Sequence, residues 1–276
     1  MKKLQVHLFG KLSIRYGSDP MLGFESTKVQ ELFCYLLLHH EHPQPRTSLA
    51  SVLWGNLCTT SNSRKYLRNA LWRLRAAIGD RPGLSNMLVT DDEWVELRPV
   101  DQLWFDVAEF EAAYRLSRKA DSFELRPHIT AIDKAVRLYT DCLLANWSQD
   151  WCVTERDRLH RHYLAMLDRL AGFHEQDGGY DDVLRLAERL LASDPAHERT
   201  HRRLMRVYLK TGDRTNALRQ YFRCVDALDS ELGVGPGPKT QAVLARIQNG
   251  DVPVVHHFGP GRFKGDGLQQ QTKAAS

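Results

Sequence analysis

The stretch SRKYLRNALWRLRAAIG, residues 63–79, combines a narrow apolar stripe with a basic surface. On a helical wheel at 100° per residue, its larger apolar side chains fall within roughly 60° of one another. They are Leu67, Leu71, Leu74 and Ile78. The rest of the stretch carries five cations and no acid. Because a solvated helix this basic usually has acidic partners one turn away, the sequence predicts a helix over 63–78 that binds a polyanion.

The polar side chains of this helix suit base recognition in double-stranded DNA. Arginine pairs with guanine through two hydrogen bonds and asparagine pairs with adenine, as in helices that enter the major groove. The candidate DNA-binding residues are Arg46, Arg64, Lys65, Arg68, Asn69, Trp72, Arg73 and Arg75. Two roles stay open for Arg75, which either contacts DNA or holds the structure locally, by pinning the wing or capping carbonyl oxygens near the helix end. A solvated basic face is the simpler alternative for the whole run.

The flanking segments predict a winged helix-turn-helix with an extra sheet at its N-terminus. In chain order we expect strands at 4–8 and 12–16, helices from 27 and over 47–54, and strands at 87–90 and 94–97. Thr27 and Gln30 have the spacing of a capping box at the first of these helices. The wing tip carries three acids in a row, Asp91, Asp92 and Glu93. Phosphate would repel such a tip, which argues against contact of the wing with DNA phosphates.

The second half of the chain has a helical pattern with an internal repeat. Leu170, Gly178, Leu184 and Ala187 recur 34 residues later as Leu204, Gly212, Leu218 and Tyr221. That spacing is the period of tetratricopeptide units, which stack because one unit alone cannot bury its apolar face. The sequence therefore predicts an all-α helical repeat domain after the winged helix.

The predicted fold is mostly α with small β sheets, in three parts. Residues 1–100 form a winged-helix DNA-binding domain, 104–249 a tetratricopeptide-like domain, and 250–276 a disordered tail. The first part carries 13 Lys and Arg against 9 Asp and Glu, whereas residues 101–249 carry 22 against 23. We expect the first two parts to separate near Pro99–Leu103, so that a 1–103 fragment folds alone.

Five stretches resemble the antibiotic-regulatory-protein (SARP) family of bacterial transcriptional activators. They are LRNALWRLRAAIG at 67–79, LWG at 53–55, TKVQEL at 27–32, WFDVAEF at 104–110 and ELGVGPGP at 231–238. The resemblance covers about 3–249 and keeps the family's order. It implies a winged helix followed by a bacterial transcriptional activation domain, binding to direct repeats near promoters, often as a homodimer on DNA, and recruitment of RNA polymerase. The wing departs from the family's pattern, with Glu93-Trp94 where Gly-Tyr is usual.

We therefore expect a cytoplasmic, sequence-specific transcriptional activator that reads DNA through helix 63–78. Two alternatives stay open: a tetratricopeptide scaffold that binds protein, and a repressor with the same fold. Neither catalytic motifs nor a cofactor-binding pattern is found, so we expect no enzyme. His197 and His201 have the i, i+4 spacing of metal ligands but lack a third ligand, so no metal is expected. A membrane-spanning run is also lacking, and the membrane is not an expected partner.

Overall fold

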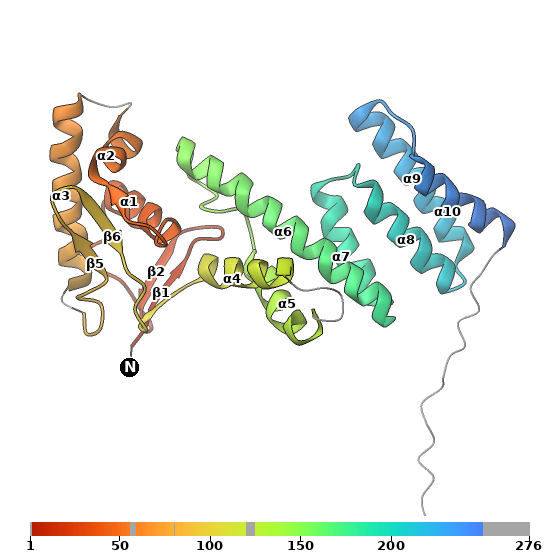
Figure 1. The fold of residues 1–276 in the computed structure, drawn as a ribbon, viewed down its shortest axis with the longest axis horizontal. Coiled ribbons are helices and arrows are strands. Elements are labelled where there is room, and N and C mark those ends of the chain that lie inside the picture. Colours follow the sequence, from red (N-terminus) through yellow and green to blue (C-terminus); the bar gives the residue numbers. More distant parts are fainter. Residues whose placement is uncertain (1, 56–58, 80, 120–124, 251–276) are drawn as a thin grey trace, which may run out of the picture. The chain divides into compact units, whose positions relative to one another are not determined.

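The computed structural model describes residues 2–55, 59–79, 81–119 and 125–250, which are mostly helical with two small sheets (Figure 1). Their contacts divide into two compact units, Met1–Ser193 and Asp194–Ser276. Each unit has its own buried apolar cluster. The tail predicted to be disordered spans residues 250–276. From residue 251 onward it lies outside the described part of the chain.

The first unit begins with the predicted hairpin. Strand β1 (Leu4–His7) pairs antiparallel with β2 (Ser13–Tyr16). The sheet has four strands in the order β3-β2-β1-β7, because β3 (Asp19–Pro20) and β7 (Leu103–Phe105) join its edges. Neither of the two added strands was predicted from the sequence. They are two and three residues long, too short to show alternation, and β7 pairs with a strand at the other end of the domain.

A three-helix layer and a second sheet follow, in the order expected of a winged helix. The helices are α1 (Thr27–Leu38), α2 (Arg46–Trp54) and α3 (Thr60–Gly79). The second sheet has the order β4-β6-β5, with β4 at Gln44–Pro45, β5 at Leu88–Thr90 and β6 at Trp94–Leu97. Strands β5 and β6 are the predicted wing, and β4 was not predicted. The predicted stripe of α3 is buried, with Leu67, Leu71, Leu74 and Ile78 each 6% exposed or less.

The capping box predicted for α1 is wrong. The residue before the helix is Ser26, and its side chain accepts no capping hydrogen bond. The Gln30 side chain instead donates from Nε2 to the Phe24 carbonyl oxygen at 2.6 Å. This side chain therefore holds the segment that leads into the helix.

The remaining helices follow one another along the chain, with the repeated glycines in two of the connecting turns. The first unit contains α4 (Asp106–Lys119), a 3-10 turn η1 (Arg126–His128), α5 (Ile129–Leu138), α6 (Asp150–Asp177) and α7 (Tyr180–Ser193). The second contains α8 (Glu198–Lys210), α9 (Arg214–Leu232) and α10 (Pro238–Asn249). Gly178 and Gly212, 34 residues apart, have φ values of 82° and 80°. These left-handed turns explain why glycine recurs at that spacing.

A buried carboxylate joins the N-terminal sheet to the helical part of the first unit. Asp106, 1% exposed, accepts hydrogen bonds from the backbone amides of Leu8, Phe9 and Val107 at 2.9–3.1 Å. Burial raises the pKa of this carboxyl, although the three amides favour its charged form. One apolar cluster runs from Leu4 to Leu190. The contacts therefore divide the chain after Ser193, whereas the sequence suggested a division near residue 100.

Candidate DNA-binding surface

Helix α3 exposes a continuous basic arc opposite its buried stripe. All seven candidate residues on this helix are exposed: Arg64, Lys65, Arg68, Asn69, Trp72, Arg73 and Arg75. Trp72 lies near the middle of the arc and is 71% exposed. At 100° per residue, Arg64, Arg68 and Arg75 lie on one side of Trp72, and Asn69 and Arg73 lie on the other. The helix thus presents cations and one amide around a large apolar side chain.

Helix α3 itself supplies no acid to neutralise the arc. Helix α3 contains no Asp or Glu. Within residues 2–55, 59–79, 81–119 and 125–250, no acid forms an ion pair with Arg64, Lys65, Arg68 or Arg73. The positive charge of these four side chains therefore faces solvent, and an approaching polyanion would meet it without displacing internal partners.

A groove lies beside the arc, between α3, the start of α2 and the wing. Its volume is about 550 Å³, and basic and acidic side chains line it together. Arg46, Arg64 and Arg68 face it from the helices, and Asp92 and Glu93 face it from the wing tip. These two acids of the predicted wing tip thus lie next to the basic arc. They lower the positive potential on the wing side of α3.

Arg46 serves the wing turn. Its Nη1 donates to the Asp91 carbonyl oxygen at 2.8 Å, and its backbone amide donates to the Glu93 carbonyl oxygen at 2.8 Å. Arg46 therefore fixes the wing against the start of α2, besides facing the groove. This contact was not predictable from local patterns, because the two segments are 45 residues apart in the chain.

Asp91 shapes the same turn through its carboxylate. Its Oδ1 accepts the backbone amides of Trp94 at 2.7 Å and Glu93 at 2.8 Å. These bonds lower the pKa of the Asp91 carboxyl, and the nearby charge of Arg46 lowers it further. Of the acids at the wing tip, Asp91 is thus engaged in the turn.

The structure assigns one of the two open roles to Arg75. Its Nη2 donates to Oγ1 of Thr90 on β5 at 2.5 Å. Arg75 therefore links α3 to the wing, as one of the two alternatives from the sequence had it. The side chain remains exposed, so this bond leaves a DNA contact open as well.

Two exposed aromatic residues near the arc were not among the sequence candidates. Tyr66 on α3 is 45% exposed and Trp94 at the start of β6 is 43% exposed. Tyr66 lies at the edge of the arc, next to Arg73 on the helical wheel. Trp94 lines the groove beside Arg64 and Arg68. The sequence did carry a signal for Trp94, because Glu93-Trp94 stands in the wing where Gly-Tyr is usual in the family that the chain resembles.

The histidine pair with metal-like spacing is engaged in packing. His201 Nε2 contacts the Pro195 carbonyl oxygen at 2.8 Å, and its Nδ1 contacts Gln220 Nε2 at 2.7 Å. His197 Nδ1 contacts Oγ1 of Thr200 at 2.7 Å. Among the residues that the structure describes, no group of three or more His, Cys, Asp or Glu side chains is placed to hold a metal ion. In the same residues, no helix is both long and apolar enough to cross a membrane.

Comparison with known proteins adds the family and the fold. The bacterial transcriptional activator domain model matches residues 105–248. The chain is 26% identical over 231 residues to the regulatory protein AfsR of Streptomyces coelicolor, covering 83% of this chain but only 23% of AfsR. It is 25% identical over 255 residues to the transcriptional regulatory protein MoaR1 of Mycobacterium tuberculosis, covering 88% of this chain and 79% of MoaR1.

A solved structure shares the architecture. Mycobacterium tuberculosis EmbR, in complex with a low-affinity phosphopeptide, superposes with a TM-score of 0.76 over 92% of this chain and 67% of the EmbR chain. The two sequences are 21% identical. This likeness confirms the fold class predicted from the sequence, a winged helix followed by tetratricopeptide-like helices.

Proposed function

Because the chain belongs to the bacterial transcriptional activator domain family, as its SARP resemblance predicted, we propose that it is a sequence-specific DNA-binding transcriptional activator. One observation carries the DNA-binding part of this proposal. The exposed arc of α3 is basic, free of acid and flanked by a wing. A major-groove helix needs such a surface, with side chains that reach base edges and others that meet phosphates.

Within this proposal the residues of the arc divide by chemistry. Arg68, Arg73 and Asn69 have side chains that pair with guanine or adenine edges. Trp72 supplies an apolar surface of the kind that contacts the methyl group of thymine. Arg64 and Lys65, in the N-terminal half of α3, are the proposed phosphate contacts, together with Arg46 at the start of α2.

The remaining partners follow from the family. We propose that two copies bind direct repeats near a promoter, and that the tetratricopeptide-like helices recruit RNA polymerase in the cytoplasm. The boundary between a DNA-binding part and an activating part, near residue 100, belongs to the same proposal. No reaction, metal or cofactor has a place in it.

Genome-wide mapping of DNA bound by the full chain, combined with transcript measurement, tests this function. We expect bound sites that contain repeated half-sites upstream of genes whose transcripts fall when the chain is deleted. Transcripts that rise on deletion would indicate a repressor with the same fold. A chain that occupies no specific DNA, while retaining a protein partner insensitive to salt, would instead support the scaffold alternative.

A further inference from the structure

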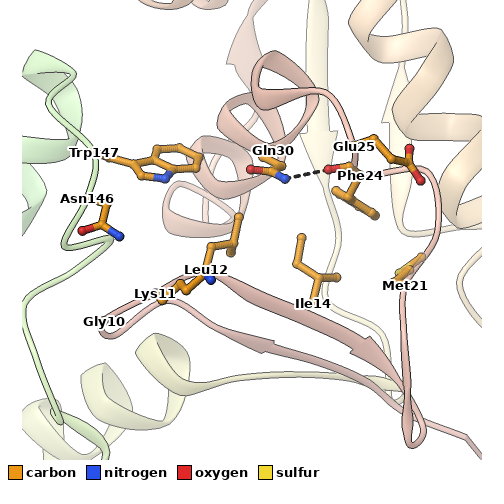
Figure 2. Close-up of a pocket in the computed structure, with 10 residues that line it drawn as sticks. All are labelled: Gly10, Lys11, Leu12, Ile14, Met21, Phe24, Glu25, Gln30, Asn146 and Trp147. Carbon is orange, nitrogen blue, oxygen red and sulfur yellow. Dashed lines mark hydrogen bonds between the residues drawn. The ribbon is translucent and has the colours of Figure 1, made fainter.

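A cavity of about 380 Å³ opens beside the β1–β2 turn (Figure 2). Its walls come from three parts of the first unit: the turn with β2, the segment leading into α1, and the loop before α6. Of the candidate DNA-binding residues, none lines it. Small-molecule sites in proteins have volumes of roughly 300–1,000 Å³. The cavity is therefore large enough for a small ligand that does not touch the proposed DNA-binding surface.

Large apolar side chains form one part of the cavity wall, beside polar and charged ones. Leu12, Ile14 and Trp147 are half-buried, and Phe24 is buried. Figure 2 shows the indole of Trp147 and the side chain of Leu12 on either side of the space at one end. The bond from Gln30 Nε2 to the Phe24 carbonyl oxygen leaves the Gln30 amide oxygen on the side of Trp147 (Figure 2). A flat, largely apolar body would bury its surface between these side chains.

The two ends of the cavity differ in charge. Lys11 and Asn146 lie at the end nearest Trp147, and Glu25 lies at the opposite end (Figure 2). Both Lys11 and Asn146 are exposed, and neither side chain has a partner among the described residues. An ammonium group and an amide N–H at one end favour a carboxylate. Glu25 accepts the Gly23 amide at 3.0 Å and, with two carboxylate oxygens, can accept a further hydrogen bond.

We propose that this cavity binds a small aromatic carboxylate. The carboxylate lies against Lys11 and Asn146, and the ring packs between Leu12 and Trp147. A hydroxyl group at the far end of the ring donates to Glu25. The ligand contacts both the segment that leads into α1 and the loop before α6, so its binding stabilises the first unit in proportion to ligand concentration.

Titration calorimetry on the full chain, without DNA, tests this site with two matched probes. 4-Hydroxyphenylacetate carries the ring, the hydroxyl group and the carboxylate, whereas 4-hydroxyphenylethanol has the same ring and hydroxyl group without the charge. We expect the acid to bind about two- to fivefold more tightly than the alcohol, because an ion pair with an exposed lysine adds a factor of that order. At equal concentration, the acid also raises the melting temperature of the chain more than the alcohol does.

Two variants and a control test which side chains bind the carboxylate of the ligand. Lys11→Gln lowers the affinity for the acid by about two- to fivefold and leaves the affinity for the alcohol unchanged. Asn146→Asp has the same effect through repulsion of the carboxylate. Lys3→Gln, which removes the same charge from an exposed residue that does not line the cavity, leaves both affinities unchanged. Equal affinities for acid and alcohol, an unaltered Lys11→Gln variant, or no heat with the acid at millimolar concentrations would overturn the proposal. None of these outcomes bears on DNA binding.

Discussion

Arg68 and Arg73 lie on the exposed arc of α3 and take no part in its apolar stripe. If these side chains read bases, replacing either with alanine weakens specific DNA binding by about 1–3 kcal/mol. The far-UV circular dichroism spectrum stays unchanged, because no buried contact is lost. Fluorescence anisotropy with a labelled operator measures the affinity. Arg219→Ala, which removes the same charge from the exposed surface of α9, is the control and keeps full affinity. Full affinity in both α3 variants would exclude the reading role.

The bond between Arg75 and Thr90 allows the two roles of Arg75 to be separated. Thr90→Val removes the hydroxyl acceptor and leaves the arginine in place. If Arg75 acts only by holding the wing, Thr90→Val and Arg75→Ala weaken DNA binding equally. If Arg75 also meets DNA, Arg75→Ala weakens it more and makes the affinity less dependent on salt. Because the Arg75 side chain remains exposed beside the other cations of α3, we expect the second result, and equal defects would contradict it.

The acids of the wing tip differ in what they do for the turn. Asp91 accepts two backbone amides, whereas Asp92 faces the groove beside Arg64 and Arg68. We expect Asp92→Asn to raise the affinity for DNA, most at low salt, because it removes a like-charge repulsion of phosphate. Asp91→Asn gives a smaller gain or a loss, since it also weakens the turn. Equal gains in the two variants, measured at matched ionic strength, would show that the hydrogen bonds of Asp91 are unimportant for the wing.

At the scale of the element, α3 acts through its summed charge. Each neutralised phosphate contributes about −0.9 to the slope of log affinity against log salt concentration. With roughly three to five phosphates met by each copy, we expect a slope of about −3 to −5 per copy, doubled on two adjacent repeats. Lys65→Gln makes the slope shallower by about one unit and preserves sequence preference, as a phosphate contact requires. A slope near zero would favour the protein-binding scaffold.

The elements also show what sequence patterns can predict. Helix α3, the first hairpin and the wing follow from local periodicity, which residues 4–16 and 63–97 carry in full. Strands β3, β4 and β7 are two or three residues long and exist only through their partners in the folded sheets. The prediction of a capping box at α1 is wrong for a related reason, because the Gln30 side chain donates to a carbonyl oxygen outside the helix. For the candidate site, the basic arc was predictable, whereas the contacts of Arg46 and Arg75 with the wing depend on tertiary packing.

At the scale of the whole molecule, Asp106 links the N-terminal sheet to helix α4 through buried hydrogen bonds. Asp106→Ala leaves buried amides without an acceptor and lowers the free energy of unfolding by about 1–3 kcal/mol. Its raised pKa means that the folded chain keeps the proton at a higher pH than the unfolded chain does. The stability contributed by Asp106 is therefore greatest below its ordinary pKa of about 3.9 and falls as pH rises through the raised value. Urea unfolding of the unaltered protein and of Asp106→Ala, across the pH range around these pKa values, measures the difference in their free energies of unfolding. That difference would grow with pH if the carboxyl were instead stabilised in its charged form.

The same junction changes the expectation that residues 1–103 fold alone. A fragment that ends there lacks Phe105 and Asp106, and with them Phe110, whose ring packs edge-on against Phe9 at 5.1 Å. A 1–193 fragment keeps the complete first apolar cluster. We therefore expect 1–193 to unfold cooperatively and to bind operator DNA. The 1–103 fragment melts at a lower temperature and is cut rapidly by protease, because it exposes the apolar surface of β1 that β7 and α4 normally cover. Equal melting temperatures of the two fragments would show that the winged helix needs neither Asp106 nor the helices behind it.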